Sequence, residues 1–502
     1  MNSQLKKIIC LIGLLFELVG YSQNSGISNR WLLGYSSGSP GYGGININFD
    51  SIPVVATHQN RKMNFNQTNA SICDKRGNLL FYTNGGWIAN AINDSMPNGR
   101  LPWVTYNPQH DGQEVPQECL FIESPGDTNI YYMFYNLIEV FFPPGFFASR
   151  YIYYLTIDKR LDNGLGAVVQ KDVIAISDTL IEGEITACKH ANGRDWWIVC
   201  HRINSNLFYK LLLTPQGVSN SFSQSIGDTM QYVQATGQAV FSPDGTKYAS
   251  YHARYTDNDL LILDFDRCTG NFSNPIHVSI DDSSASGGVA FSPNSQFLYA
   301  CSRNYVYQFN MNDTNVALSK LKVATYDGYY SPQPPFASSF FLAQLAPNGK
   351  IYINSTNSVV DLHVINSPDS LGLACNLTQH SFSLQAYNSF TIPNHPNYFL
   401  GADSGSVCDT LQLGINESNT NRNSIFRIHP NPAVDIINLN FTPINQTQEL
   451  EIINVNGEIV LKRNIPQWSQ LHQIDVRSLH NGIYLCRLKS ARNTKSCKFI
   501  KE

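Results

Sequence analysis

The sequence is poor in charge and carries few signatures of known chemistry. Only 14% of its 502 residues are Asp, Glu, Lys or Arg, and the formal net charge is −4. Lys and Arg form no basic stripe, so no nucleic-acid partner is expected. An HExxH zinc pattern and a phosphate-binding loop are also absent. The sequence therefore predicts no catalytic residue, no metal site and no cofactor. It favours binding over catalysis without deciding between them.

Long apolar runs are confined to the beginning of the chain. Lys6 and Lys7 precede the apolar run 8–16, and small residues follow. This is the pattern of a secretory signal peptide, which we place at residues 1–23. No later stretch approaches the ~20 apolar residues that a membrane-spanning helix needs. We expect a mature chain that is exported and does not span a membrane.

The cysteines also exclude a familiar kind of site. None of the 11 cysteines forms a CxxC pair, which argues against a zinc or redox centre. Most lie in strand-like runs and are interpreted as small buried side chains. If disulfides form in the exported chain, the first pairs to examine are Cys375 with Cys408 and Cys188 with Cys200.

What the sequence does contain is a repeat. Residues 241–250 place a Pro-Asp-Gly turn between two short apolar runs, and the same order recurs at 291–300 and 345–353. Looser copies occur earlier, and the turn positions are 49 to 67 residues apart. Such an element is a tight turn between two β-strands. The turn residues are Gly77, Gly126, Gly193, Asp244, Gly245, Asn294, Asn348 and Gly349.

A repeat of this length predicts a β-propeller. Each copy is followed by a further β-rich run, as expected for blades of four short strands. Helical periodicity is hard to find, so the fold class is all-β. Six turns leave two ends, 31–35 and 398–401, which we expect to share a seventh blade and close the ring. The predicted propeller covers residues 24–403, with six or eight blades as alternatives.

The N-terminal part also follows the order of a known family. A Trp-aromatic-Gly opening at 31–35, a strand pair at 74–85, a Met-Pro-Asn-Gly turn at 96–99 and a strand at 129–134 follow one another. This order resembles the N-terminal part of secreted propeller proteins of Bacteroidetes, often labelled gliding-motility-associated. The resemblance implies architecture and export, and no activity.

A second, smaller module follows a change of composition. Residues 404–424 are rich in Gly, Ser and Asn and are interpreted as a linker. Residues 425–502 alternate strand-like runs with Asn-Gly turns, which predicts a small Ig-like β-sandwich.

This module resembles the type A sorting domain of the type IX secretion system. The residues that carry the resemblance are Pro430, Asn431, Pro432, Asn456, Gly457, Asn481, Gly482 and Tyr484. His429 and Glu458 depart from the commoner Tyr and Lys. The resemblance implies passage through the periplasm, recognition by the type IX machinery, and release or attachment at the outer-membrane surface. A generic Ig-like adhesion domain is the alternative.

Several ionisable side chains are candidates for catalytic or metal-binding roles. His190, His201 and His252 lie in comparable parts of two blades, but strand histidines are more often structural. Glu182 and Glu184 match no catalytic pattern. The acidic stretch 257–266 lacks the glycine and the terminal glutamate of a calcium-binding loop. None of these groups is therefore assigned a role.

Aromatic residues are abundant and leave the ligand open. The loop-like segments 141–147 and 326–336 combine Pro with Phe and Tyr. Exposed aromatics of this kind suit a glycan or protein ligand, and packing over a blade is an equal alternative. We expect a binding or interaction scaffold. The alternatives are a secreted hydrolase or lyase acting on glycans, and a structural surface or motility-associated component.

Overall fold

The computed structural model describes residues 26–36, 39–102, 112–141, 146–229, 237–253, 258–283, 287–331, 336–409, 426–441, 445–467, 469, 471–490 and 494–502. The chain divides into two compact units, Met1–Leu411 and Gln412–Glu502. The predicted signal peptide lies outside the described residues, as does most of the predicted linker. The first unit continues beyond Asp403, where the sequence placed the end of the propeller.

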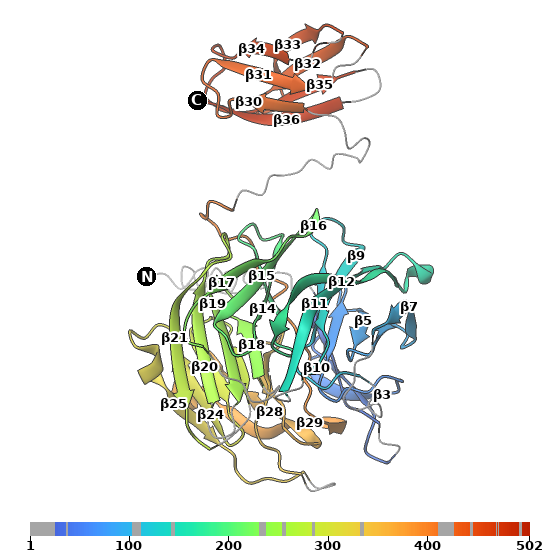
Figure 1. Ribbon diagram of the computed structural model, residues 1–502, viewed down its shortest axis with the longest axis vertical. Helices are drawn as coiled ribbons and strands as arrows, with labels where there is room; N and C mark the ends of the chain where they lie inside the picture. The colour runs from blue at the N-terminus through green and yellow to red at the C-terminus, as the bar shows by residue number, and fades with distance from the viewer. Residues whose placement is uncertain are drawn as a thin grey trace, which may run out of the picture. The chain divides into compact units, whose positions relative to one another are not determined.

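Seven antiparallel sheets succeed one another along the first unit (Figure 1). The first has three strands, and the others have four or five. The first sheet consists of β1 (Arg30–Leu33), β2 (Gly44–Asn48) and β3 (Val55–Gln59). The second consists of β4 (Ala70–Cys73), β5 (Leu79–Thr83), β6 (Trp87–Asn90) and β7 (Ser95–Arg100). The third consists of β8 (Cys119–Glu123), β9 (Ile130–Asn136), β10 (Glu139–Phe141), β11 (Phe146–Asp158) and β12 (Ala167–Leu180).

The remaining four sheets follow the same plan. The fourth sheet consists of β13 (Thr186–Lys189), β14 (Trp196–His201), β15 (Leu207–Thr214), β16 (Gly217–Val218) and β17 (Phe222–Ser225), and the fifth of β18 (Gly237–Phe241), β19 (Lys247–Ala253), β20 (Asn258–Phe265) and β21 (Phe272–Ile280). The sixth consists of β22 (Gly288–Phe291), β23 (Phe297–Cys301), β24 (Tyr305–Asn310) and β25 (Leu321–Thr325). The seventh consists of β26 (Ala343–Leu345), β27 (Ile351–Ile353), β28 (Val359–Ile365) and β29 (Leu377–Asn388).

Helical structure among the described residues is limited to four short 3₁₀ helices. These are η1 (Gly26–Ser28), η2 (Asp162–Gly164), η3 (Val316–Ser319) and η4 (Gly372–Cys375). The predicted all-β fold class is confirmed.

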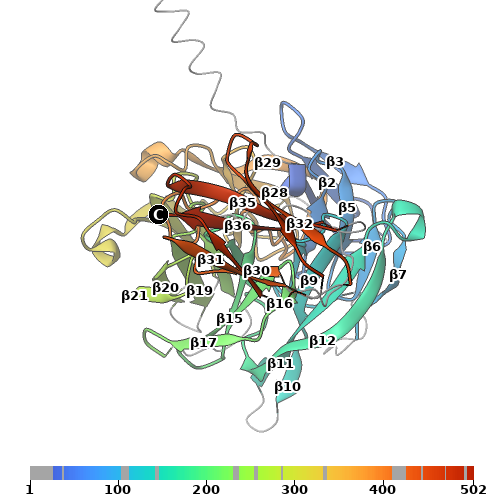
Figure 2. The same cartoon turned by 90° about the horizontal axis from the view of Figure 1, so that it is seen from above.

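The sheets are arranged as a ring. The first strands of neighbouring sheets touch in succession, since β4 contacts β1 and β8, and β18 contacts β13 and β22. Figure 2 shows β6 and β7 on the side of the unit opposite to β20 and β21. The first strands therefore face a common axis, as the inner strands of propeller blades do.

Apolar clusters join each sheet to the next and close the ring. One cluster packs Ala249 and Leu260 of the fifth sheet against Val289 and Leu298 of the sixth. Another packs Trp31 of the first sheet against sheet seven. Burial of these flat apolar faces is what holds neighbouring sheets together. The first unit is thus a seven-bladed β-propeller.

The closure of the ring differs from the prediction. We expected residues 398–401 to add a strand to the sheet that contains residues 31–35, but that sheet holds only β1, β2 and β3. Residues 389–397 instead run beside β4 without forming a regular strand, and Asn394 N donates to Asn69 O at 3.0 Å. Tyr398 continues into the core of the second to fourth sheets. The ends meet through this backbone bond, side-chain bonds and packing, because Pro393 and Pro396 interrupt a regular ladder.

The disulfide also differs from the expected pairs. Cys408 is bonded to Cys268, which lies 140 residues away in the sequence. Cys375, Cys188 and Cys200 are free and buried. Cys188 and Cys200 lie on neighbouring antiparallel strands, but their positions are out of register, since Cys188 faces Trp197 and Cys200 faces Tyr209. The bond to Cys268 fixes residues after the last blade to the fifth sheet.

The second unit consists of two antiparallel sheets around one core. One sheet has the order β30-β31-β34 and the other β33-β32-β35-β36. Leu439, Leu450 and Phe499 pack between them. This is the small Ig-like sandwich that the alternating sequence predicted. Its strands are β30 (Phe426–His429), β31 (Ile436–Phe441), β32 (Gln448–Ile453), β33 (Ile459–Ile465), β34 (Leu471–Asp475), β35 (Gly482–Lys489) and β36 (Thr494–Lys501).

Candidate functional site

The predicted turn residues lie where the first strand of a blade connects to the second. Gly77, Gly126 and Gly193 occupy this connection in the second to fourth sheets. Asp244, Gly245, Asn294, Asn348 and Gly349 occupy it in the last three sheets. Gly245 and Gly349 have φ of 73° and 74°, a conformation that glycine adopts without steric cost.

These turns define one end of the central channel. In the fifth sheet, β18 begins at Gly237 and ends at Phe241, just before the Pro-Asp-Gly turn. Its five residues span about 13 Å. We call the side of Pro243, Pro293 and Pro347 the turn end. The opposite side, where β18 begins at Gly237, is called the start end.

The segment 389–399 occupies the channel between the two ends. Asn394 is its central anchor and is 4% exposed. Its Nδ2 donates to Cys119 O (3.1 Å) and to Ile185 O (2.9 Å), and its Oδ1 accepts from Gln117 Nε2 (3.2 Å). Gln117 also bonds the backbone of Ala239 through both of its amide atoms. The side chains of Asn394 and Gln117 thus link the third, fourth and fifth sheets.

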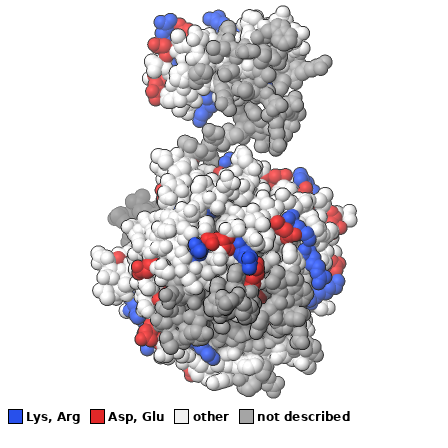
Figure 3. Space-filling model, viewed as in Figure 1, with Lys and Arg blue, Asp and Glu red and all other residues white. Residues whose placement is uncertain are grey.

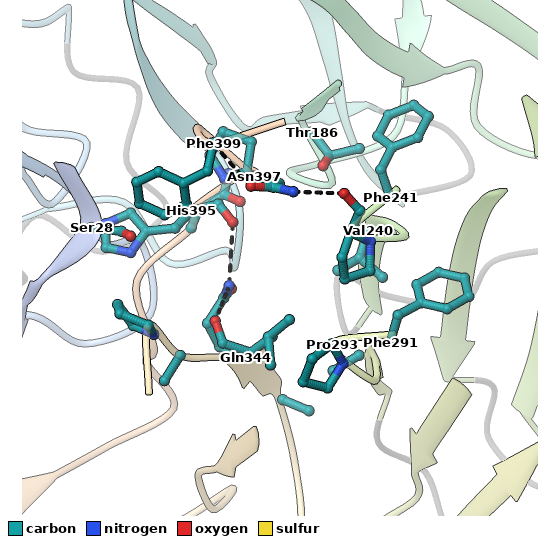
Figure 4. A pocket seen from close by; sticks show the side chains of 18 of the residues that line it. Ser28, Thr186, Val240, Phe241, Phe291, Pro293, Gln344, His395, Asn397 and Phe399 are labelled. Carbon is teal, nitrogen blue, oxygen red and sulfur yellow. Dashed lines mark hydrogen bonds between the residues drawn. The ribbon is translucent and has the colours of Figure 1, made fainter. Parts of the chain in front are cut away.

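A cavity of about 250 Å³ opens at the turn end (Figure 4). Blade turns and the ends of inner strands form one wall, in which Pro293 lies beside the space and the rings of Phe241 and Phe291 point away from it. The segment 394–399 forms the other wall, where Asn397 Nδ2 donates to Pro243 O (2.6 Å). The cavity is therefore shared by several blades and by the chain segment that follows the last blade.

The chemistry of this cavity is neutral. Its lining contains no Asp, Glu, Lys or Arg among the described residues, and its polar groups include Ser28, Gln344 and Asn397. His395 lines it as well, and burial lowers the pKa of this ring to about 4. Its Nε2 lies 3.0 Å from Ser71 O and donates to it, so the ring is neutral near pH 7. Phe399 is 43% exposed at the rim.

The start end of the channel, in contrast, brings ionisable side chains together. Glu184, His201 and His252 each offer one ligand-type atom, and these atoms lie within 4.8 Å of one another. His252 Nδ1 is 2.8 Å from Glu184 Oε1, and the two imidazole rings are 5.5 Å apart. Burial raises the pKa of Glu184 to about 8, and it lowers those of His201 and His252 to about 4 and about 3.

Two further carboxyl groups are buried at the start end. Glu118 accepts a hydrogen bond from Thr68 Oγ1 at 3.0 Å, and burial raises its pKa well above the usual range. Burial also raises the pKa of Glu182 to about 8, with a further contribution from Glu184. Burial of an unpaired carboxylate is costly, so these groups are held as neutral acids.

The sequence named the members of this cluster but did not bring them together. The sequence groups His201 and His252 with His190, but His190 lies elsewhere, with its Nε2 3.1 Å from Cys268 O. Glu184 precedes β13 in the fourth sheet, whereas His252 lies on β19 in the fifth. The useful signal was the alignment of strand ends in adjacent repeats. This alignment places the ends of the second strands of neighbouring blades at the same level along the channel.

Other candidate residues do not converge on a site. Asp264 pairs with Lys247, and Asp266 accepts from Thr269, so both belong to local turn contacts. Residues 34–38 fit the letters of a Gly-x-Ser-x-Gly nucleophile elbow. That motif requires a strand followed by a helix, and residues 39–43 lead into strand β2 instead.

The aromatic segments divide between core and surface. Tyr326 donates to Tyr329 O, and Tyr329 stacks on His380 with ring centroids 4.1 Å apart. Phe336 and Tyr330 are 42% and 58% exposed. Residues 142–145 and 332–335 lie outside the described residues. The segment 326–336 thus keeps some exposed aromatic surface away from the cavity.

The sorting-motif residues lie in the loop after β30, in the turn between β32 and β33, and around the start of β35. Asn431 joins the loop after β30 to β36, because its Oδ1 accepts from Ile500 N at 2.9 Å. Asn456 and Gly457 form the turn between β32 and β33, and Gly457 has φ of 83°. Tyr484 stacks on Phe499 and donates to His480 O. Pro430 and Pro432 flank Asn431, and Asn481 and Gly482 lead into β35.

The surface of the described residues carries both signs of charge. On the face shown in Figure 3, Lys and Arg lie close to Asp and Glu, and most atoms are uncharged. No large patch of one sign is visible there, in agreement with the low charge content. No helix among the described residues is long and apolar enough to cross a membrane.

The fold and the site define a propeller with a neutral cavity, followed by a small β-sandwich. Residues 427–502 match the family model described as a secretion system C-terminal sorting domain. The second unit is therefore a sorting domain of this kind, which confirms that part of the predicted resemblance. Such a domain implies export to the cell surface or secretion.

Comparisons of the whole chain add little about its activity. Similar solved structures include a functionally unknown protein from Desulfotomaculum acetoxidans DSM 771 (12% identity, TM-score 0.38, 74% of this chain and 100% of that chain). Others are a periplasmic gluconolactonase from Pseudomonas aeruginosa (10%, 0.39, 72% and 98%) and the Dos1 propeller (11%, 0.33, 67% and 92%). No curated protein matches the chain in sequence.

Proposed function

We propose that this protein is an exported binding scaffold whose propeller takes up a neutral ligand at the turn end of its channel. The observation that carries the proposal is the cavity lined by Pro293, Gln344 and Asn397 without any Asp, Glu, Lys or Arg among the described residues. A ligand site is typically apolar with a few converging polar groups. A neutral glycan segment fits this lining best, because its hydroxyls pair with the amides of Gln344 and Asn397 and a sugar ring can stack on the exposed ring of Phe399 at the rim.

The sorting domain supports the route to the cell surface. We propose that the chain crosses the inner membrane with its signal peptide and is then recognised by the type IX secretion machinery. Export of this kind and the order of motifs at 31–134 support an origin in Bacteroidetes. The final location is the outer-membrane surface or the medium.

The test is a binding and turnover screen with neutral glycans and polysaccharides. It uses the mature chain, Asn24 to Glu502, because truncation before Cys408 would remove the disulfide to Cys268. Binding is measured by calorimetry, and products are analysed in the same samples. Saturable binding without products is the expected result. Reducing ends or unsaturated products would establish a glycan-active enzyme and overturn the proposal.

Three variants locate the ligand. Phe399→Ala removes an exposed ring at the cavity rim and should weaken binding about 5- to 10-fold, the effect of one lost stacking contact. Phe222→Ala is the matched control, since Phe222 is 50% exposed on β17. Phe336→Ala tests the other aromatic surface. A loss with Phe336→Ala and none with Phe399→Ala would move the site to 326–336 and contradict the cavity assignment.

Absence of glycan binding would contradict the proposed ligand. In that case self-association of the purified chain, measured by light scattering, separates the remaining classes. Filament-like assembly would indicate a structural surface component.

A further inference from the structure

We propose that Glu184, His201 and His252 form a binding site for one divalent transition-metal ion, of which Zn²⁺ is the representative. The three side chains come from the fourth and fifth blades, and their ligand-type atoms lie within 4.8 Å of one another. The sequence alone led us to expect no metal. The spatial arrangement of these residues argues for revising that expectation.

The donor set selects the class of ion. Two imidazole nitrogens and one carboxylate oxygen suit Zn²⁺ and its neighbours, whereas Ca²⁺ and Mg²⁺ prefer sets of oxygen ligands. In a tetrahedral zinc site the ligand atoms lie about 3.3 Å apart. His252 Nδ1 and Glu184 Oε1 are 2.8 Å apart, so these two atoms must move about 0.5 Å further apart to share a tetrahedral ion.

The backbone around Glu184 is arranged to hold its carboxylate in place. Glu184 has φ of 52°, a left-handed conformation that is unfavourable for a non-glycine residue. The neighbouring backbone is fixed, since Ile185 N donates to Gln117 O and Ile181 N donates to His201 O. A strained residue held by its surroundings is a common feature of functional sites.

Gly237 leaves the space that the pair requires. A Cβ atom at this position would lie 2.0 Å from Glu184 Oε1 and 3.0 Å from His252 Nδ1. Gly237 pairs with His252 across β18 and β19. The glycine therefore provides room directly beside the candidate ligands.

Unpartnered oxygens add a second, independent observation. Glu184 Oε2 and Glu182 Oε1 are buried and accept no hydrogen bond among the described residues. The two residues are 2% and 4% exposed. A buried carboxyl oxygen without a partner is unfavourable, and coordination of Glu184 to a cation would offset that cost.

The test measures metal content and affinity directly and requires no glycan. The mature chain is stripped with a chelator, dialysed and titrated with ZnCl₂, and the bound ion is quantified by mass spectrometry. The second readout is the visible absorption spectrum after loading with Co²⁺, which reports coordination by nitrogen and oxygen. We expect about one ion per chain and a higher Tm in the presence of Zn²⁺.

Glu184→Gln and His252→Gln keep the approximate shape of each side chain and should weaken Zn²⁺ binding at least 10-fold. The matched controls are Glu118→Gln and His395→Gln, which alter a buried carboxyl and a buried imidazole outside the cluster. Both controls should retain the wild-type stoichiometry. If a ligand variant does not fold, the Co²⁺ spectrum of the wild-type chain still decides the nature of the donor atoms.

Three results would overturn the proposal. The first is failure of the wild-type chain to retain a stoichiometric ion. The second is equal retention by ligand and control variants. The third is a Co²⁺ spectrum with thiolate charge-transfer bands, which would assign the ion to free cysteines. None of these results would affect the neutral cavity, because glycan binding there is measured separately.

Discussion

The two ends of the propeller channel differ in chemistry although the same inner strands connect them. At the turn end, Phe241 and Pro293 line a cavity without charged side chains. At the start end, Glu184 and His252 lie in contact and are almost fully buried. The blade repeat specifies the backbone of both ends alike. The difference shows that function in this fold depends on which side chains the repeat presents at each end of the strands.

Asn394 lies between the two ends, and its removal should have the largest effect on stability. Asn394→Ala eliminates three side-chain hydrogen bonds and leaves Cys119 O, Ile185 O and Gln117 Nε2 with fewer partners. At about 1 kcal/mol for each bond, the propeller should lose about 3–4 kcal/mol. Chemical denaturation of the mature chain measures the loss.

The control is Asn397→Ala. Asn397 belongs to the same segment, where its Nδ2 donates to Pro243 O and its Oδ1 accepts from Phe399 N. At about 1 kcal/mol for each bond, the expected loss is about 2 kcal/mol. Equal losses for the two variants would show that Asn394 is not the anchor that separates the ends.

Gly237→Ala should have the next largest effect and tests whether the start end is as closely packed as the distances indicate. The added methyl group would lie 2.0 Å from Glu184 Oε1, so the carboxyl group must move. Overpacking of this kind costs about 1–3 kcal/mol. A thermal-unfolding midpoint lower than wild type is expected.

Gly401→Ala is the matched control, because no atom lies within 4 Å of the Cβ that it would add. It should leave the midpoint nearly unchanged. If the two substitutions gave the same midpoint, the crowding at Gly237 would be relieved without cost, and the start end would not be closely packed.

His395→Gln should have the smallest effect, and it appears only on acidification. The folded-state pKa of His395 is about 4, below the unfolded value of about 6.5. Stability from the neutral ring is therefore complete above pH 6.5 and is lost as the pH falls towards 4. At pH 5 the loss amounts to about 2 kcal/mol.

The measurement compares wild type and variant at pH 7.5 and pH 5. Wild type should lose more stability than the variant by about 2 kcal/mol over this interval. The difference isolates His395 from the other buried histidines, which titrate in both proteins. An identical pH dependence would mean that the ring at the turn end is protonated without cost.

Much of the fold was predictable because its signals are local. The turn at Pro243, Asp244 and Gly245 and the buried strand β23 need only neighbouring residues to take their conformations. The sorting domain was equally accessible, since its turn at Gly457 and its strand at Tyr484 follow one another within a short module. The spacing of the turns then limited the number of blades.

The closure of the ring and the disulfide were predicted wrongly. The residues after the last blade were expected to form a strand, but Asn394 and Tyr398 bond to other blades through their side chains. Cys375 was the first partner to examine for Cys408, and Cys408 bonds Cys268 instead. Both outcomes depend on where the chain goes after leaving the ring, which no local pattern specifies.

The sequence by itself determined the repeated strand and turn pattern, the all-β class and the C-terminal sorting domain, because short-range preferences and alternation encode them. Only the tertiary structure decided that Glu184 of the fourth blade meets His252 of the fifth, and that the cavity beside Phe241 is neutral. The physical reason is that side chains far apart in the sequence become neighbours only when blades pack. Their burial, and hence their pKa values, follows from that packing.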